Sequence, residues 1–469
     1  MKAKSGNKAQ KPTMITTAEK WGFLTFSAAS NIVFNFKSIY YLIFLTNVLK
    51  IPVLTAGTIL TLGTIWDALN DPLIGLWAAN HKFKNGERIR PLALWFSLPF
   101  GITTVLMFTN FHTKGWVTVA LCIAIYFVFE AFNTYTAIPY NAMGSLASNL
   151  DSDRQSINAF RSLGACVGSG IGAVAVTPLV KLFGGLKGEG AIIGEGDGKA
   201  LFLTALFMGV LCVIGCLAHY FTTRERVQPE DSEDEIHMSM FEAYKILFKC
   251  KSWIWNMCYI IGYGIVTALI MDAINYYAAY VIGDSAASTP ILAVYLVMAV
   301  LFSIITPAID LKFGRKATAI FGVLIQVVGK IPFMLAPYSM AGIYINALTT
   351  GIGSTITFIL FNTNRNNIAD ILEFQSGKRI DAMVAAGDNL ISKLAEAGAV
   401  QLMAVALSVA GFNEALKINQ TPETIKTIIA LLGWVPALVA VLMFLVLLKL
   451  DTKKEYDEEK AKAEAKNAA

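Results

Sequence analysis

Three polar side chains inside one long apolar stretch of the sequence have the types and spacing of a cation or proton site. Asp67, Asn70 and Asp71 are three and four residues apart, so on a helix they project from one face. One aspartate near the centre of a bilayer costs roughly 2.5–3.5 kcal/mol on insertion scales. Two of them are expected only where the helix face lines a wet cavity or holds a cation. The alternative is neutralisation by basic side chains on neighbouring helices.

The ligand atoms of this group limit the ion that it could take. Hard cations such as Na+ prefer oxygen ligands, and two carboxylates held close together can share a cation or retain a proton. The six cysteines and four histidines show no spacing typical of a zinc or haem site. We therefore predict a coupling ion, Na+ or H+, with no other metal and no cofactor.

Lys37 is a basic residue near the middle of the first apolar stretch, where an ammonium group is as costly as an acid. One hypothesis is that Lys37 approaches Asp67 and Asp71 and replaces the coupling cation or competes with it. The alternatives are that Lys37 reaches a membrane interface or faces the substrate cavity.

The elements that must position these residues are stretches long enough to cross a bilayer. Hydrophobic residues make up 55% of the chain and charged residues 15%, whereas a soluble domain carries about 25% charged residues. Apolar stretches of roughly 18–25 residues predict an all-α, multi-pass integral membrane protein with both termini on one side. The twelve predicted spans are 21–48, 53–79, 91–110, 116–146, 158–183, 201–222, 254–282, 289–309, 317–336, 340–370, 383–410 and 427–449.

The loops give the orientation and the division into parts. Basic residues at 82–90 and 312–316 mark these loops, and therefore both termini, as cytoplasmic by the positive-inside rule. Similar Gly-turns with basic residues at the same place in each half indicate two parallel six-helix repeats. The expected parts are a leader at 1–20, a first bundle at 21–222, a linker at 223–252, a second bundle at 253–450 and a tail at 451–469.

Several stretches, taken in order, resemble one family of transporters. They are 66–75, Ile138-Pro139-Tyr140, 153–161, Thr223 to Val227, 276–284 and 369–379. The chain thereby resembles the glycoside–pentoside–hexuronide:cation symporters (melibiose permease-like) of the major facilitator superfamily, over nearly its whole length. The resemblance implies twelve helices in two halves and cation-coupled symport of a small polar solute by alternating access. It also implies that Asp67, Asn70, Asp71 and Thr134 bind Na+, Li+ or H+.

Polar residues in other apolar stretches are candidates for the substrate site. Some of them have alternative roles, since a buried asparagine can simply bond a neighbouring helix and Arg161, Asp388 and Lys393 can form a structural ion-pair network. Arg161 and Lys393 match family positions that line the sugar site. The predicted substrate-binding residues are Asn31, Asn35, Tyr140, Asn141, Arg161, Asp272, Asn275, Asp388, Asn389 and Lys393.

The resemblance is incomplete at three positions that bind galactosides in the family. The acid on the fourth helix is Ala137 here, a nearby aromatic is Asn141, and the first helix offers Ser27 or Ala29 in place of an acid. These differences argue against a galactoside. The remaining cationic groups favour an anionic or amide-rich solute such as a hexuronide, although Asp272 and Asp388 could cancel their charge.

Charged residues near the cytoplasmic ends of the helices are expected to act as a gate. We expect them to form salt bridges across the two halves when the transporter is open outward, and to separate when it opens inward. The predicted gating residues are Arg90, Asp310, Arg315, Asp370, Glu373 and Arg379. Gly164, Gly168 and Gly172 form a small-residue stripe that predicts close approach of another helix.

Other function classes remain as alternatives at this point. They are a lysolipid transporter, a transporter of a non-sugar anion, and a proton-coupled exporter that uses Glu130. An enzyme is not expected, because no nucleophile–base set or histidine metal motif is present. The expected partners are a small-molecule substrate and membrane lipids, without nucleic acid, and we expect a monomer in the inner (plasma) membrane of a bacterium.

Overall fold

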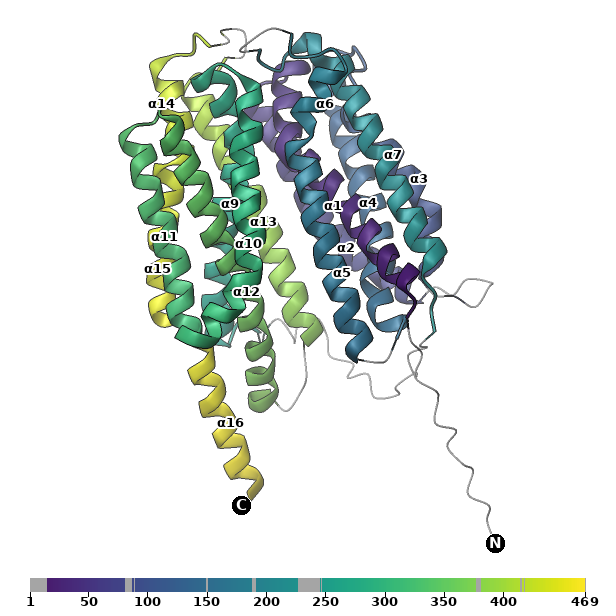
Figure 1. Ribbon diagram of the computed structural model, residues 1–469, viewed down its shortest axis with the longest axis vertical. Helices are drawn as coiled ribbons and strands as arrows, with labels where there is room; N and C mark the ends of the chain where they lie inside the picture. Colours follow the sequence, from purple (N-terminus) through teal and green to yellow (C-terminus); the bar gives the residue numbers. More distant parts are fainter. Residues whose placement is uncertain are drawn as a thin grey trace.

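The computed structural model of the protein describes residues 15–80, 87, 89–148, 151–187, 191–226, 245, 247–376, 381–413, 416 and 418–468. Every regular element in these ranges is helical, which confirms the predicted all-α class. Two groups of helices stand side by side (Figure 1). The N-terminal half contains α1 (Thr17–Ile43), α2 (Val53–Asn80), α3 (Arg90–Met107), α4 (Trp116–Leu146), α5 (Asp151–Val174), α6 (Val176–Leu182) and α7 (Gly198–Thr222).

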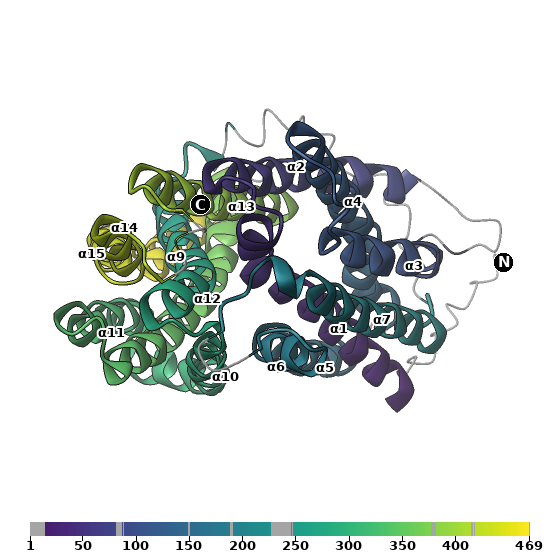
Figure 2. The ribbon, with the colours of Figure 1, turned by 90° about the horizontal axis from the view of Figure 1, so that it is seen from above.

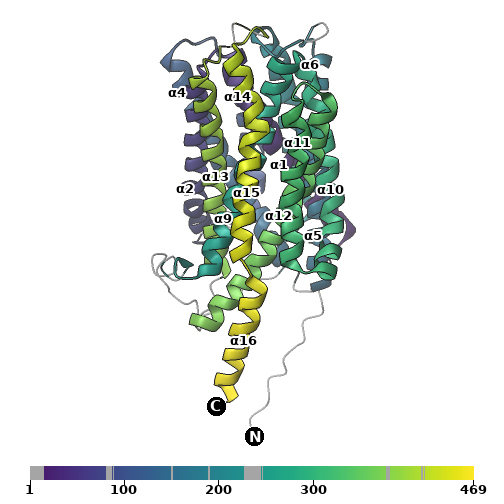
Figure 3. The ribbon, with the colours of Figure 1, turned by 90° about the vertical axis from the view of Figure 1, so that its left-hand side faces the viewer.

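The second group of helices forms the C-terminal half. It contains α9 (Lys251–Tyr276), α10 (Ser288–Phe313), α11 (Arg315–Leu335), α12 (Met340–Ser376), α13 (Asp381–Val409), α14 (Pro422–Leu432) and α15 (Trp434–Lys449), and α16 (Thr452–Ala468) extends beyond it. Most of the predicted linker, at 227–244 and 246, lies outside the described residues. Figure 3 shows that α16 leaves the bundle at the end where α1 begins, and we call this end the terminal end.

The described helices include ten that are long and apolar enough to cross a membrane, or eleven if the bent pair α5 and α6 counts as one span. The chain is therefore a multi-pass membrane protein. Helix α2 is not among these ten, although its 28 residues give it a length of about 42 Å. The predicted count of twelve spans thus stays a prediction, and α2 is the helix that carries Asp67 and Asp71.

Local sequence explains where α1 begins. Thr16 caps the helix by accepting a hydrogen bond from the backbone N–H of Glu19, and the Glu19 carboxylate accepts one from the N–H of Thr16 at 2.8 Å. This reciprocal arrangement satisfies two backbone donors that a helix start leaves unpaired. Arg226, just after α7, lies 2.5 Å from the other oxygen of Glu19, so the cap also ties the start of α1 to the end of the N-terminal half.

The glycine stripe of α5 confirms the predicted close approach of another helix. A Cβ atom on Gly168 would lie 2.2 Å from the carbonyl oxygen of Ala28, and Gly164 and Gly172 meet carbonyl oxygens of α1 in the same way. Helix α1 therefore packs directly on the backbone of α5. This contact holds α1 at the centre of the molecule, between α5, α7 and the C-terminal half (Figure 2).

The two halves contact each other along three pairs of helices, one of which is formed by α1 and α9. Helix α2 packs against α13, and α5 packs against α10. On the α2–α13 seam, Thr61 donates a hydrogen bond to Gln401 at 3.1 Å, and Gly57 faces the methyl group of Ala404. Helices α2 and α13 thus form a continuous contact on which the charged residues described below are placed.

The halves are also joined at the end opposite the terminal end, which we call the closed end. Tyr280 donates to the Asn47 side chain at 2.9 Å, and Thr46 lies 3.0 Å from the Tyr276 hydroxyl. In the adjoining loops, the backbone N–H of Ser285 donates to the carbonyl of Ala191 at 3.1 Å. These bonds connect the two halves across the closed end, whereas the ribbons of the halves diverge toward the terminal end (Figure 1).

Candidate functional site

The two carboxylates of α2 lie together with a lysine from the other half. The ammonium of Lys393 on α13 lies 2.7 Å from Oδ2 of Asp67 and also bonds Oδ2 of Asp71. One full turn of helix separates the two acids, which is why a single side chain can reach both. The charge-assisted bonds across the α2–α13 seam therefore connect the N-terminal half to the C-terminal half.

Two further polar groups complete this cluster. Thr134 on α4 donates a hydrogen bond to Oδ1 of Asp71 at 2.7 Å, and Asn70 donates to Thr134 at 3.3 Å. Asn70 and Thr134 are buried, so their hydrogen bonds hold the α2–α4 side of the cluster in place. The structure thus brings together all four residues predicted for the cation site. It also adds Lys393, which the sequence placed at the substrate site.

Lys37 does not bond Asp67 or Asp71, as one hypothesis predicted, but pairs with another carboxylate. Its ammonium is 2.5 Å from Oε1 of Glu130 on α4, a residue only 1% exposed. The rings of Phe34, Tyr126 and Phe129 surround the ammonium with centroids 5.2 to 5.5 Å away. Three aromatic faces and a buried carboxylate give the charge a well-matched environment. Lys37 therefore pairs with Glu130, and Lys393 takes the place at the α2 acids that was expected for Lys37.

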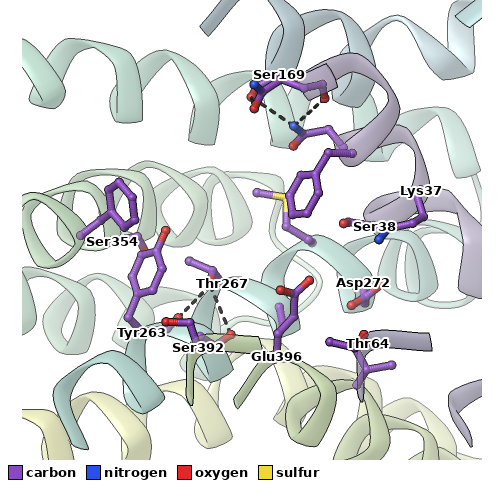
Figure 4. Close-up of a pocket in the computed structure, with 18 of the residues that line it drawn as sticks. Lys37, Ser38, Thr64, Ser169, Tyr263, Thr267, Asp272, Ser354, Ser392 and Glu396 are labelled. Atoms are coloured by element: carbon purple, nitrogen blue, oxygen red, sulfur yellow. Dashed lines mark hydrogen bonds between the residues drawn. The ribbon is translucent and has the colours of Figure 1, made fainter. Parts of the chain in front are cut away.

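A cavity of about 400 Å³ lies between the halves. Helix α1 supplies four residues to its wall, Asn31, Asn35, Lys37 and Ser38. Lys37 thus faces the cavity, as one of the alternatives for this residue predicted. Figure 4 shows several of the lining side chains together. The C-terminal half contributes Tyr263, Thr267, Asp272, Tyr295, Phe358, Ser392 and Glu396.

Hydrogen bonds fix the amide side of this cavity. Asn31 donates to the carbonyl of Ser27 at 2.9 Å, and Asn35 donates to the carbonyl of Asn31 at 2.9 Å. Asn35 also donates to Ser169 on α5 at 3.1 Å. The amides therefore bond within the N-terminal half and still present polar atoms to the cavity. The two amides thus have both expected roles, a hydrogen bond to a neighbouring helix and a place on the cavity wall.

Arg161 and Tyr140 do not line this cavity and contact each other instead. The Arg161 guanidinium lies 4.3 Å from the centroid of the Tyr140 ring and 5.0 Å from that of Phe23, and it donates to the Tyr140 carbonyl. Tyr140 in turn stacks on Phe26 at 4.3 Å. The aromatic neighbours of Arg161 account for its position, because a guanidinium stacks well on such rings.

Four more predicted substrate residues also lie outside the cavity wall, namely Asn275, Asp388 and Asn389 of the C-terminal half and Asn141 of α4. Asn275 donates to the carbonyl of Ile39, which places it between α9 and α1. Asp388 accepts a hydrogen bond from the indole of Trp253 at 3.1 Å and lies 3.9 Å from Arg365, which is the structural network considered as its alternative. Asn141 and Asn389 are exposed. Of the ten predicted substrate residues, only Asn31, Asn35 and Asp272 line the cavity.

Glu396 is an acidic residue of the cavity that was not among the predicted site residues. It lies on α13 three residues after Lys393, so the two side chains share a helix face. An acid within the apolar stretch 383–410 was an available signal, of the same kind that identified Asp67. The aromatic lining residues, such as Tyr263 and Phe358, had no such signal, because aromatic residues occur throughout the spans.

Those predicted gating residues whose side chains the structure describes do not connect the halves in this conformation. Arg90 pairs with Glu87 and donates to the carbonyl of Tyr220 at 3.1 Å, all within the N-terminal half. Among the residues that the structure describes, Asp310, Arg315 and Asp370 form no ion pair across the halves. The side chain of Glu373 and the whole of Arg379 lie outside the described part. This pattern is the one expected when the terminal end is open.

Known proteins that are similar in sequence show to which family the chain belongs. The family model described as MFS/sugar transport protein matches residues 22–452. The chain belongs to this family. It is 26% identical to the inner membrane symporter YicJ of Escherichia coli, with 91% of this chain and 90% of the relative aligned. It is 25% identical to the isoprimeverose transporter of Lactiplantibacillus pentosus, with 90% and 86% aligned.

More distant proteins share the fold and part of the sequence. The sodium-dependent lysophosphatidylcholine symporter 1 of Xenopus tropicalis is 24% identical, with 68% of this chain and 65% of the relative aligned. A crystal structure of a bacterial homologue of the lysosomal transporter Spinster, described as inward-facing and unoccupied, superposes with a TM-score of 0.67 at 13% identity and covers 92% of this chain and 98% of its own. The fold is thus that of a major facilitator transporter.

Proposed function

We propose that this protein is a secondary active transporter that couples the movement of a small glycoside-like solute to a cation, Na+ or H+, by alternating access. The observation that carries the proposal is the cluster of Asp67, Asn70, Asp71 and Thr134 in the N-terminal half, with Lys393 of the C-terminal half bonded to both acids. The family membership and the symporter relatives support the same function.

The proposed coupling ion would be held by the oxygen atoms of this cluster. Two carboxylates and a threonine hydroxyl are the ligands that a hard monovalent cation prefers. Lys393 already places a positive charge there, so a cation and the lysine compete for the same oxygen atoms. Cation binding then weakens the contact between α2 and α13. Because such coupling is reciprocal, any rearrangement that withdraws Lys393 strengthens cation binding.

The cavity between the halves is the proposed solute site. Its volume of about 400 Å³ lies in the lower part of the range of roughly 300–1,000 Å³ for small-molecule sites. Amides, hydroxyls and carboxylates alternate with aromatic rings on its wall, which suits a ligand that carries hydroxyl groups on an apolar ring. Its position between α1, α9 and α13 makes the solute a contact shared by both halves, as alternating access requires.

The conformation supports a transporter open toward the terminal end. Hydrogen bonds such as that of Tyr280 to Asn47 join the two halves at the closed end. At the terminal end, Arg90 bonds only to residues of its own half among those that the structure describes. If the terminal end is cytoplasmic, as the basic loops predict, this state is inward-facing. The contact of Lys393 with Asp67 in this state is then the arrangement after the cation has left and before the carrier returns outward.

Transport into proteoliposomes tests the proposal. Purified protein is reconstituted, and the uptake of isoprimeverose, β-glucosides, pentosides and hexuronides is measured under an imposed Na+ gradient and then an H+ gradient. We expect one solute class to accumulate against its gradient. Asp67→Asn should abolish the accumulation and keep downhill exchange, whereas Glu423→Gln, at an exposed acid of α14, should behave as the wild type.

A second candidate function is transport of a lysolipid, favoured by the similarity to the lysophosphatidylcholine symporter. The same vesicles therefore include lysophosphatidylcholine as a substrate. Na+-dependent uptake of this lipid without uptake of any glycoside would replace the solute assignment and keep the coupling site. Absence of concentrative uptake of every compound under both gradients would refute symport.

A further inference from the structure

Two acidic side chains of the C-terminal half line the cavity and take no part in the coupling cluster. Asp272 comes from α9 and Glu396 from α13. Figure 4 shows both beside the cavity, together with Lys37 and Ser38 of α1. The two helices are packed closely, since a Cβ atom on Gly264 of α9 would lie 3.1 Å from the methyl group of Ala395. The acids thus belong to one wall, built by α9 and α13.

Neither acid has a basic partner in the described part of the chain. Asp272 is 5% exposed, and its Oδ1 atom has no hydrogen-bond partner. No ion pair joins Glu396 to a lysine or arginine among these residues. The two neighbouring lysines hold other carboxylates, since Lys37 is 2.5 Å from Glu130 and Lys393 bonds the α2 acids.

A buried carboxylate oxygen without a donor is costly, so it points to a ligand that supplies the donor. Hydroxyl groups of a sugar are such donors, and hydrogen bonds to a carboxylate are stronger than those between neutral groups. The rest of the wall fits the same ligand. Tyr263 and Phe358 offer faces for the apolar side of a sugar ring, and Asn35, on the opposite side, offers an amide.

The charged residues that line the cavity disfavour an anionic ligand. Lys37 is the basic residue among the described lining residues, and Glu130 neutralises it at 2.5 Å. Among the described lining residues, the cavity therefore offers no free cation to a ligand. A solute with a carboxylate of its own would bury that anion beside two acids without a counter-ion, which costs much more free energy than burying a neutral hydroxyl group and so rejects the anionic ligand.

We propose that Asp272 and Glu396 form a hydroxyl-binding wall that recognises neutral glycosides and rejects hexuronides. This inference rests on the proposed transport of a glycoside-like solute and deepens it. It also accounts for the galactoside-binding acids absent at Ala137 and on the first helix. In this chain, the carboxyl groups that bind sugar hydroxyls come from the C-terminal half. The sequence favoured a hexuronide as the substrate, whereas the cavity favours a neutral glycoside.

Ligand pairs that differ only in charge test the wall directly. Binding of methyl β-D-glucoside and methyl β-D-glucuronide, and of methyl β-D-galactoside and methyl β-D-galacturonide, is measured by calorimetry on the purified full chain. We expect the neutral member of at least one pair to bind at least tenfold more tightly than its uronide. Asp272→Asn and Glu396→Gln should each weaken neutral binding about tenfold or more and narrow the difference between the members of the pair.

Controls separate recognition from folding. Asp272→Glu and Glu396→Asp keep the acidic group and should recover part of the affinity, and each variant should keep the wild-type unfolding temperature in detergent. Glu423→Gln should leave the affinities unchanged. If a variant has a clearly lower unfolding temperature, its affinity is set aside. The acid-conserving variant at the same position and the comparison of ligand pairs on the wild type then decide the question.

The outcomes distinguish this inference from the transport function. A uronide that binds as tightly as its neutral partner, or neutral binding that is unchanged in both Asp272→Asn and Glu396→Gln, overturns the wall even if uptake is cation-coupled. Preferential binding of methyl β-D-glucosaminide over every neutral glycoside overturns it too and assigns the acids to an amine. If no sugar binds and none is accumulated, the transport proposal and the wall fall together.

Discussion

The ammonium of Lys393 lies 2.7 Å from the carboxylate of Asp67, although the two residues belong to different halves of the molecule. This contact connects the proposed cation site to the seam along which the halves must move. It also means that the occupancy of the site and the contact between the halves are not independent.

Replacing Lys393 by glutamine should tighten Na+ binding. The substitution removes the positive charge that competes with a cation for the two carboxylates. A hydrogen bond to a charged group contributes about 1.5–3 kcal/mol, so we expect at least a tenfold lower dissociation constant for Na+, measured by calorimetry at pH 8. Lys454→Gln, at a lysine on α16 that is 74% exposed, is the control. An unchanged Na+ affinity would show that the lysine does not compete with the ion.

Breaking the Lys37–Glu130 pair should destabilise the protein, because Glu130 is 1% exposed and would be left without its counter-ion. Removing one partner of a buried pair typically costs about 3–5 kcal/mol. We therefore expect Lys37→Met to lower the unfolding temperature in detergent markedly, and the double variant Lys37→Met/Glu130→Gln to recover much of the loss. Additive losses from the two substitutions would argue against an energetic coupling between them.

The stripe on α5 offers a matched pair of glycine substitutions. Gly168→Ala places a methyl group 2.2 Å from the carbonyl oxygen of Ala28, whereas at Gly170 the new methyl group meets no atom within 4 Å. Overpacking of this kind costs about 1–3 kcal/mol. Gly168→Ala should therefore reduce the unfolding temperature and the transport rate, and Gly170→Ala should leave both near the wild-type values. Equal behaviour of the two variants would mean that α1 and α5 separate easily.

Weakening the closed end should shift the conformational equilibrium. Tyr280→Phe removes the 2.9 Å hydrogen bond to Asn47, and a loss of about 1 kcal/mol corresponds to roughly a fivefold change in population. A cysteine placed at Ser38 in a background without the native cysteines reports this change. Membrane-impermeant maleimide should label it faster from the closed-end side in the Tyr280→Phe variant. Tyr338→Phe, at a tyrosine that is 70% exposed, should have no effect on labelling.

The sequence predicted the parts of the site that depend on spacing within one helix. Asp67, Asn70 and Asp71 share a face in the structure because helical periodicity determines it, and the glycine stripe of α5 meets α1 for the same reason. The family and the all-helical class also followed from patterns along the chain. The resemblance to known symporters added Thr134, which spacing alone could not identify.

Contacts between distant helices were not predictable in this way. Lys393 is 322 residues from Asp71, and no local pattern shows which face of α13 meets α2. Arg161 had the charge of a ligand-binding residue, but the neighbouring rings of Tyr140 and Phe23 hold it outside the cavity. Glu396 was not predicted as a site residue, although it lies one helical turn from Lys393 on the same helix. The rotation of each helix about its axis decides such questions, and it is set by packing over the whole bundle.

The pairing of one lysine with two aspartates has an electrical consequence for the transport cycle. With both carboxylates ionised, Asp67, Asp71 and Lys393 together carry one negative charge, and a bound monovalent cation brings their sum to zero. The loaded site then crosses the membrane field as a neutral unit, and the unloaded site crosses it as an anion. A potential that is negative inside drives that anion outward, with about 2.3 kcal/mol per 100 mV for a full crossing of the field. The membrane voltage therefore acts on the resetting of the carrier, and the ion gradient acts on its loading.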